Sequence, residues 1–412
     1  MLRKEVVVQV SSVRNNRLTR NIELKQGNRF GQSYIIPNEK IDRAIQDALD
    51  KLEKNIPKWW DDFAKTHSVD YMYLKGPNDN WVCGMQTGIY WLAYELSGNP
   101  KFLEIADRQT MSFRERYEKK RGMDDHDVGF AFSPSCIAGY KVTGNKEYRN
   151  IALDACDYYY HTSYTKKGGF ILRAWNWTGD AGCRTMMDTM MNAPFLFWCG
   201  EQTGKKEYTE AAKSQNAITE KYLIRKDGSS FHHYQFEPGT FRPLHGITWQ
   251  GYSDQSCWSR GQAWAICGYP IAYSYSKEAY IVELHKDITY YMLNHLPKDF
   301  IPQWDLIFTE ADNQPKDSSA GVIAVCGMLE MCKYLGDELP QKVIYQNASA
   351  RMLEAVIDKC AGNIEREYDG LIYQVTHALP QGLGIDECAI YGDYFYLEAL
   401  MRYKNPQWNR YW

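Results

Sequence analysis

The chain has 412 residues, of which 44% are hydrophobic and 24% are charged, and its formal net charge at pH 7 is −3. This composition is typical of a globular protein with a large core, and it excludes the overall basic field that holds nucleic acid or anionic lipid. Residues 1–8 lack a signal-peptide pattern and no run of 18 apolar residues occurs, so we expect a cytoplasmic protein that does not enter a membrane, or a periplasmic one if a leader was removed.

In chain order, the first element is a polar arm, residues 1–38, in which Val6–Val8 could form a short strand. Residues 39–412 are expected to form a single domain. Its first helix is predicted from apolar residues that recur with a period of 3.6, namely Ile41, Ala44, Ile45, Ala48, Leu49 and Leu52.

A repeated sequence pattern then follows, in which an apolar helix ends at a Gly-type cap and a short polar turn leads to the next helix. Clear copies occupy residues 94–102, 140–148 and 202–208, and degenerate copies occupy 273–280, 334–337 and 403–406. Each unit is typical of an αα-hairpin, and no hairpin buries its apolar face alone. Six such units predict an all-α protein, an (α/α)6 barrel or six-hairpin toroid. Residues 225–256 and 363–385 are expected to be long loops at one end of the ring.

Eleven cysteines are scattered singly without a CxxC pair. We interpret them as reduced, mostly buried thiols. The nine histidines show no metal-ligand spacing, so neither a metal nor another cofactor is expected.

Asp127 and Asp188 are the candidate catalytic residues, because both lie in apolar surroundings where an ionised carboxylate is costly. Asp127 precedes Ser133-Pro134-Ser135, which reads as a helix start. Asp188 is four residues before Asn192 and lies among methionines, which predicts a raised pKa suited to proton donation. For each aspartate, a purely structural role is the alternative.

A third group of candidates lies between Gln250 and Trp264. On a helix, Arg260 and Trp264 share a face, and a guanidinium beside indoles could bind a carboxylate over a stacking platform. Such a pair can also be an Arg–aromatic stack at the edge of a core. His232 lies in a loop-like stretch and could bond a sugar hydroxyl or be structural, while Trp81 could line the mouth of the ring.

Together these segments resemble glycoside hydrolase family 88, the unsaturated glucuronyl hydrolases, from about residue 40 to residue 412. The motifs that carry the resemblance are residues 81–95, 126–130, Asp188 with Asn192, 250–254, 260–264, 305–308 and 391–394.

The resemblance implies an (α/α)6 barrel that acts, without a cofactor, on oligosaccharides with a 4,5-unsaturated uronic acid at the non-reducing end. Asp188 would be the general acid and base. Asp127 would bind substrate hydroxyls and shift the pKa of Asp188 through the proximity of its like charge. Arg260 and Trp264 match positions near the uronate carboxylate, and Arg260→Ala is expected to weaken substrate binding. Other matching pocket positions are Gln250, Trp258, His232, Trp175 and Trp81.

Three departures from the family pattern stand out. Trp249 stands where a polar residue is usual, Met85 stands where an aromatic is usual, and residues 378–383 lack the serines and lysine that serve sulfated substrates in some members. Sulfate recognition by that loop is therefore in doubt. The oligomeric state is not predicted.

Three other functions remain open. An unsaturated rhamnogalacturonyl hydrolase would use the same chemistry on pectin fragments, although residues 81–95 and Arg260 favour the glucuronyl version. A sugar epimerase on the same toroid would need basic residues paired across the ring, which the sequence does not show. A non-catalytic carbohydrate-binding toroid would need the aromatic residues but not Asp188.

Overall fold

A computed structural model describes residues 20–25, 27–174, 182–362 and 367–412. Helices dominate these residues. The α-helices are α1 (Gly27–Phe30), α2 (Asn38–Trp59), α3 (Val82–Ser97), α4 (Pro100–Glu118), α5 (Val128–Phe132), α6 (Ala138–Thr143), α7 (Lys146–Ser163), α8 (Thr189–Thr203), α9 (Lys206–Ile218), α10 (Ser259–Ser276), α11 (Tyr280–Asn294), α12 (Ser318–Cys332), α13 (Pro340–Cys360) and α14 (Ile390–Lys404). Short π or 3-10 segments are η1 (Ser133–Ile137), η2 (Thr219–Leu223), η3 (Glu310–Asp312) and η4 (Leu379–Gln381).

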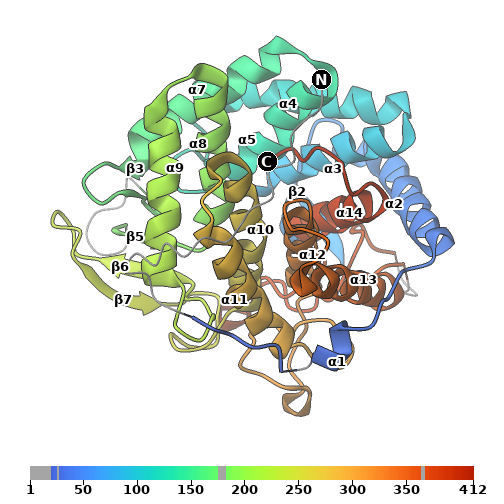
Figure 1. Ribbon diagram of the computed structural model, residues 1–412. Coiled ribbons are helices and arrows are strands. Elements are labelled where there is room, and N and C mark those ends of the chain that lie inside the picture. Colours follow the sequence, from blue (N-terminus) through green and yellow to red (C-terminus); the bar gives the residue numbers. More distant parts are fainter. Residues whose placement is uncertain (1–19, 26, 175–181, 363–366) are drawn as a thin grey trace, which may run out of the picture.

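An inner ring of helices surrounds the axis of the molecule (Figure 1). Each inner helix contacts the next in the order α3, α5, α8, α10, α12 and α14, and α14 returns to α3. These helices are buried over nearly their whole circumference, which explains why their sequences are apolar on every face rather than on one stripe.

An outer ring of helices covers the inner one, and α2, α4, α7 and α9 of this ring each bury a single face. The inner–outer pairs are α3 with α4, α5 with α7, α8 with α9, α10 with α11, α12 with α13, and α14 with α2. The last pair joins the two ends of the chain, so the ring is closed. The predicted (α/α)6 barrel is therefore confirmed.

The first five copies of the repeated pattern lie at hairpin turns, and the sixth, residues 403–406, lies at the end of α14, the last helix. Helices α3, α6 and α8 end at Gly98, Gly144 and Gly204, whose φ angles of 67°, 73° and 73° are left-handed. Glycine reaches this region without the penalty that a Cβ atom imposes. In the degenerate fourth copy, Lys277 takes the same conformation with φ 56°.

The segment after Asp127 differs from the prediction of a helix start at Ser133. The helix already begins at Val128, and Ser133 opens the π-helical segment η1 in the middle of a continuous helical run. Pro134 has no N–H to donate, and a local π turn accommodates such a missing bond. The prediction that Asp127 lies just before a helix is nevertheless correct.

The described residues also form three small antiparallel sheets outside the helices. Strands β1 (Phe63–Val69) and β2 (Met72–Gly76) pair, as do β3 (Tyr164–Thr165) and β4 (Phe170–Ile171). A third sheet has the order β5 (Arg184–Met186), β6 (His233–Phe236) and β7 (Pro243–Ile247), with Thr185 opposite Tyr234. The segment at 225–256, predicted as a loop insertion, thus contains a hairpin that pairs with the strand just before Asp188.

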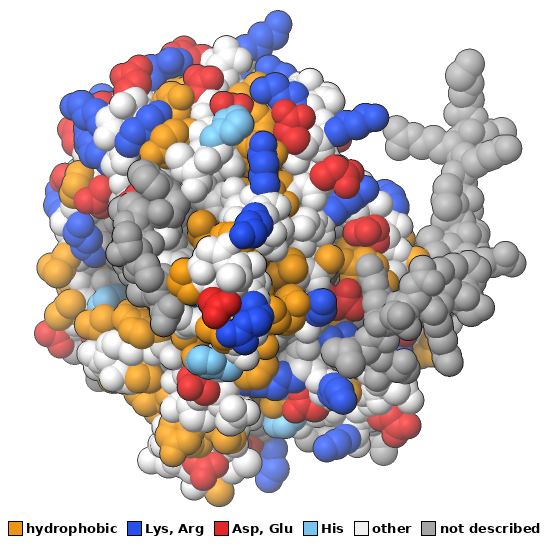
Figure 2. Space-filling model, turned by 90° about the vertical axis from the view of Figure 1, so that its left-hand side faces the viewer, with side chains coloured by type: hydrophobic (Ala, Val, Ile, Leu, Met, Phe, Trp, Pro, Cys, Tyr) orange, Lys and Arg blue, Asp and Glu red, His pale blue; other side chains and the backbone are white. Residues whose placement is uncertain are grey.

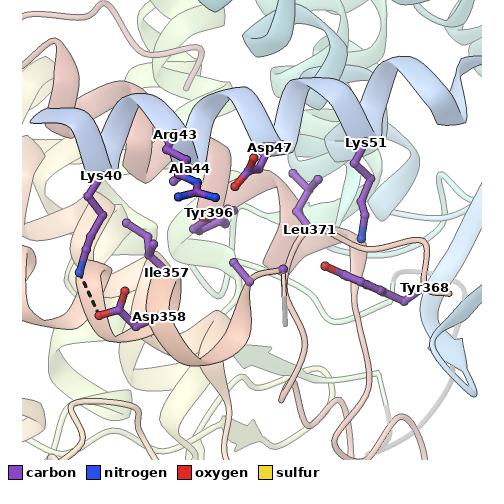
Figure 3. Close-up of a pocket in the computed structure, with 13 residues that line it drawn as sticks. Lys40, Arg43, Ala44, Asp47, Lys51, Ile357, Asp358, Tyr368, Leu371 and Tyr396 are labelled. Atoms are coloured by element: carbon purple, nitrogen blue, oxygen red, sulfur yellow. Dashed lines mark hydrogen bonds and ion pairs between the residues drawn. The ribbon is translucent and has the colours of Figure 1, made fainter. Parts of the chain in front are cut away.

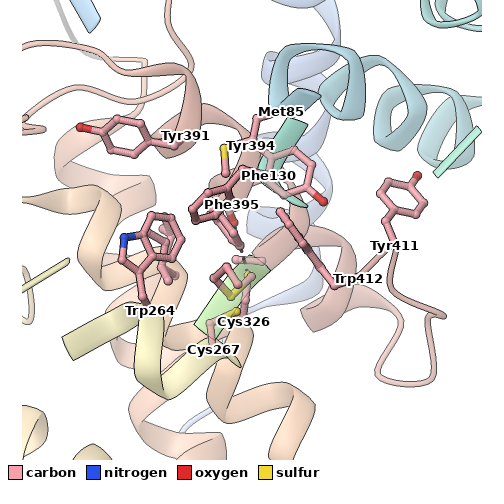
Figure 4. Packing of buried hydrophobic residues seen from close by; sticks show 14 of the residues in the cluster. Met85, Phe130, Trp264, Cys267, Cys326, Tyr391, Tyr394, Phe395, Tyr411 and Trp412 are labelled. Carbon is pink, nitrogen blue, oxygen red and sulfur yellow. Dashed lines mark hydrogen bonds between the residues drawn. The ribbon is translucent and has the colours of Figure 1, made fainter. Parts of the chain in front are cut away.

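Trp412 fills the centre of the ring (Figure 4). Its indole is 1% exposed, stacks on Phe395 of α14 at a centroid distance of 6.0 Å, and meets Phe130 of α5 edge-on. Nearby, Lys141 Nζ donates to the carbonyls of residues 410 and 411 at 2.7 and 3.2 Å. The last residues of the sequence therefore bind to several inner helices at once.

The described part of the N-terminal arm lies against the outer ring, where Arg20 donates to the carbonyls of Glu220 and Ile224. Val6–Val8 lie outside the described residues, and the division into an arm and one domain stays a prediction. Among the described residues, no helix combines the length and apolar character needed to cross a membrane. All eleven cysteines are free and buried, as predicted.

Candidate active site

Asp127 and Asp188 occupy equivalent places on neighbouring inner helices. Asp127 is the residue before α5, and Asp188 is the residue before α8. Asn192 joins the two helix ends, because its Nδ2 donates to the Asp188 carbonyl at 3.1 Å and its Oδ1 accepts from the N–H of Phe130 at 2.9 Å. A Cβ atom on Gly129 would meet the Cα of Asn192 at 2.8 Å, so glycine permits this close approach.

Both carboxyl groups can be reached from outside despite their apolar surroundings. The side chain of Asp127 is 17% exposed and that of Asp188 is 14% exposed. Neither side chain caps its helix, although a residue in this place commonly does so. A structural role as a helix cap is therefore not seen for either aspartate.

Burial shifts the pKa values of both aspartates upward. It raises the pKa of Asp188 to about 6, against the opposing effects of its own backbone N–H and of Arg260 and Arg173. The pKa of Asp127 is raised well above the usual value, mainly by burial and then by the carboxylates of Asp125 and Asp188. The pair therefore retains protons at a pH where ordinary aspartates are ionised, which suits acid catalysis.

His232 faces Asp188. Its Nδ1 accepts backbone N–H groups from Trp249 and Gln250, each at 3.3 Å, so the ring proton belongs on Nε2. Burial, followed by Arg260, lowers the pKa of His232 well below its usual value and keeps the ring neutral. The distance from Nε2 to Asp188 Oδ2 is 3.7 Å, too long for a direct hydrogen bond.

These two atoms have no hydrogen-bond partner among the described residues. Buried polar atoms in folded proteins are seldom left in this state, and exceptions call for an explanation. A substrate hydroxyl could satisfy both atoms only from beside the pair, because 3.7 Å leaves no room for an oxygen between them.

Arg260 lies in the first turn of α10, and its guanidinium is held by other groups of the same chain. Its Nη1 pairs with Asp317 and donates to the Thr376 carbonyl at 3.0 Å, and its Nη2 donates to the His377 carbonyl. The guanidinium lies over the rings of Trp258 and Tyr391, at 4.5 and 4.7 Å. The predicted Arg–aromatic stack exists, but the carboxylate that it holds in this structure is that of Asp317.

The other predicted site residues divide into two groups. Gln250 lies beside the acid pair, with its N–H on His232 and its Nε2 donating to the His377 carbonyl at 2.8 Å. Trp258 is also close, with its ring 4.3 Å from that of His232. Trp81 is half-buried and stacks on Tyr391 at 5.3 Å.

Trp264 belongs instead to the core. It is 1% exposed and packs against Phe130 and Phe395 at 5.1 and 5.4 Å, so its faces are covered and only Nε1 lacks a partner within the described residues. The predicted platform beside Arg260 is thus formed by other rings. Trp175 lies outside the described residues.

One group of side chains among the described residues has the spacing of a metal site. Ligand atoms of Asp125, His126 and Asp127 lie within 4.8 Å of one another. However, the Asp125 carboxylate lies 3.5 Å from the Arg173 guanidinium, and a cation there would compete with that pair. The arrangement is equally explained as a charge network that braces Asp127.

A cavity of about 490 Å³ lies elsewhere, between α2 and α13 (Figure 3). Lys40 at one end pairs with Asp358 at 3.1 Å, and Lys51 at the other donates to the Gly370 carbonyl at 3.0 Å. None of the predicted site residues lines this cavity. Its size therefore does not bear on the acid pair.

Two further side chains of the candidate site were missed from the sequence. Asp317, fully buried before α12, was not considered although it too precedes an apolar run. The same burial argument that singled out Asp188 would have found it. Arg173 lowers the pKa of both Asp127 and Asp188, and no local pattern marks it.

Known proteins resemble this chain over most of its length. Residues 52–359 match the model of Glycosyl Hydrolase Family 88. An unsaturated chondroitin disaccharide hydrolase of Streptococcus pneumoniae is 39% identical, over 95% of this chain and 98% of its own length. The crystal structure of an unsaturated glucuronyl hydrolase from Streptococcus agalactiae, 36% identical, superposes with a TM-score of 0.92 over 97% of this chain and 100% of that one. A variant of the latter, solved with dGlcA-GalNAc6S, is 34% identical over 95% of this chain and 99% of its own length, with a TM-score of 0.85.

Proposed function

Because the chain belongs to glycoside hydrolase family 88, we propose that Asp188 is the proton donor with which it releases 4,5-unsaturated uronic acid from lyase-generated oligosaccharides. The observation that supports this role is a reachable carboxyl group, 14% exposed, whose pKa burial raises to about 6. One relative is named an unsaturated chondroitin disaccharide hydrolase, and a variant of another was solved with dGlcA-GalNAc6S, which supports an unsaturated uronate-containing saccharide as this chain's substrate.

The first step hydrates the double bond. Asp188 gives its proton to carbon 4, and the positive charge that develops at carbon 5 is shared with the ring oxygen. Water then adds to carbon 5 and returns a proton to the Asp188 carboxylate, so the acid is regenerated. One side chain thus serves as acid and then as base.

The product of hydration is a hemiketal at carbon 5, which opens by cleavage of the bond between carbon 5 and the ring oxygen. The resulting hemiacetal at carbon 1 releases the rest of the saccharide as an alcohol and leaves an aldehyde. The net reaction consumes one water molecule. No step requires attack at the anomeric carbon.

The remaining polar groups are proposed to hold the uronate. Arg260 and Arg173 are the cations that act on Asp188, and each is also paired with a carboxylate, of Asp317 and of Asp125. Asp127 and the Nε2–H of His232 are placed to bind hydroxyl groups. Trp258 and Gln250 hold His232 in position through ring contact and a backbone bond.

The direct test uses the ultraviolet absorbance of the conjugated double bond. Purified protein is mixed with unsaturated disaccharides from lyase-digested chondroitin or hyaluronan, and loss of absorbance with release of the second sugar is expected. Binding without loss of absorbance would instead indicate a carbohydrate-binding toroid.

The pH profile gives a second expected result. Since Asp188 must be protonated to start the reaction, kcat/KM should be high below its pKa and fall as the pH rises through about 6. The profile is measured with an unsaturated disaccharide, whose own carboxylate is already ionised in this range. A profile that stays flat from about pH 5 to pH 8 would contradict this assignment.

A further inference from the structure

Trp249 presents a solvent-exposed indole at the mouth of the candidate site. Among the tryptophans that the structure describes, it is the one with an exposed side chain, at 50%, whereas Trp258 and Trp264 are 3% and 1% exposed. An exposed indole is costly to maintain in water, and such groups often mark binding surfaces.

The backbone of Trp249 is fixed on both sides. Its N–H donates to His232 Nδ1 at 3.3 Å, and its carbonyl accepts from Gln381 Nε2 at 2.7 Å. Because His232 Nε2 faces Asp188, one imidazole ring connects the acid to the residue that carries the indole. Trp249 is therefore held at a set place beside the reacting group.

This place is on the leaving-group side of the site. His232 is buried and only 14% of the Asp188 side chain is exposed, so a saccharide whose uronate reaches them extends its other sugar outward past the rim. The rim contains Trp249 and, next to it, the loop that carries Gln381. Residues 246–253 and 376–385 contain no lysine or arginine, and burial keeps His377 neutral by lowering its pKa well below the usual value.

We propose that the indole of Trp249 is the stacking platform for the second sugar of the substrate, and that this sugar is an uncharged pyranose. A pyranose ring offers a face of C–H groups that packs flat on an indole. A negatively charged substituent on that sugar would find no cation in the two rim segments. This inference rests on the proposed function and specifies the leaving group that the same site accepts.

The test compares two substrates that share the unsaturated uronate. One carries an uncharged hexosamine as its second sugar, and the other carries a methyl group in its place. For Trp249→Ala, KM for the disaccharide should rise about tenfold, as the loss of one stacking contact predicts. KM for the methyl glycoside should not change, and Trp249→Phe should keep most of the affinity for the disaccharide.

Tyr252→Ala is the matched control. Tyr252 is 59% exposed and only three residues away, but its ring packs against Phe308 at 5.0 Å. It should leave both substrates unaffected. Equal effects of Trp249→Ala on the two substrates, no effect on either, or the same discrimination in Tyr252→Ala would each overturn the proposal. Failure of the unchanged protein to hydrolyse either substrate would refute the proposed function itself.

Discussion

Replacing Asp188 with Asn should lower kcat by at least a hundredfold, the smallest effect usual for losing a general acid. The amide has the shape of the carboxyl group but cannot give a proton to carbon 4 or take one from water. The backbone contacts of residue 188, including the bond from Asn192 Nδ2 to its carbonyl, remain available. The loss should therefore appear in kcat and not in the melting temperature.

The control for this variant is Asp61→Asn. Asp61 pairs with Arg108 on the surface, where its side chain is 68% exposed, so the same chemical change there should leave kcat unaltered. Turnover is followed by the decrease of ultraviolet absorbance at saturating disaccharide. Near wild-type turnover by Asp188→Asn would assign the proton transfer to another group.

Replacing Arg260 with Ala should lower the free energy of unfolding by about 3–5 kcal/mol, the usual cost of removing one partner from a buried ion pair. The side chains of Arg260 and Asp317 are 2% and 0% exposed, so the variant leaves a carboxylate inside the protein without its cation. The carbonyls of Thr376 and His377 lose their donor as well. A change in substrate binding, expected from the sequence, would come in addition to this loss.

Urea denaturation measures the effect, with two further variants for comparison. Adding Asp317→Asn to Arg260→Ala should recover part of the stability, because the unpaired charge is gone. Arg108→Ala removes a surface cation from Asp61 and should change the stability little. If Arg260→Ala were as stable as the unchanged protein, Arg260 would be free to serve the substrate alone.

The fold could be predicted from the sequence because its signals are local. A glycine such as Gly98 or Gly144 ends one helix, and the asparagine that follows it caps the next. The signal for such a hairpin turn therefore lies in a short stretch of consecutive residues. The π segment at Pro134 and the third sheet depend on packing and on strand pairing between Arg184–Met186 and residues about 50 positions away. Local patterns do not encode those partners.

The site was predictable in part for the same reason. The apolar surroundings of Asp188 are visible in its neighbours along the chain, and so is its spacing to Asn192. The bonds of Arg260 are not, because Asp317 and His377 lie 57 and 117 positions away. From the sequence, the Arg260 guanidinium was expected to bind the carboxylate of a substrate. In the structure it is already paired with the carboxylate of Asp317.

The surface carries lysines, arginines and acidic residues intermixed on the face shown in Figure 2. This distribution agrees with the small net charge of −3. Anionic saccharides are therefore not attracted by the molecule as a whole, and their recognition must come from the site.

The position of Trp412 makes the barrel a cup instead of a tube. Its indole lies across the axis between Phe130 and Phe395, so no polymer can thread through the ring. We therefore expect a polysaccharide to be bound by its terminus and not by an interior uronate. Removal of one unit at a time from a chain end is the expected consequence.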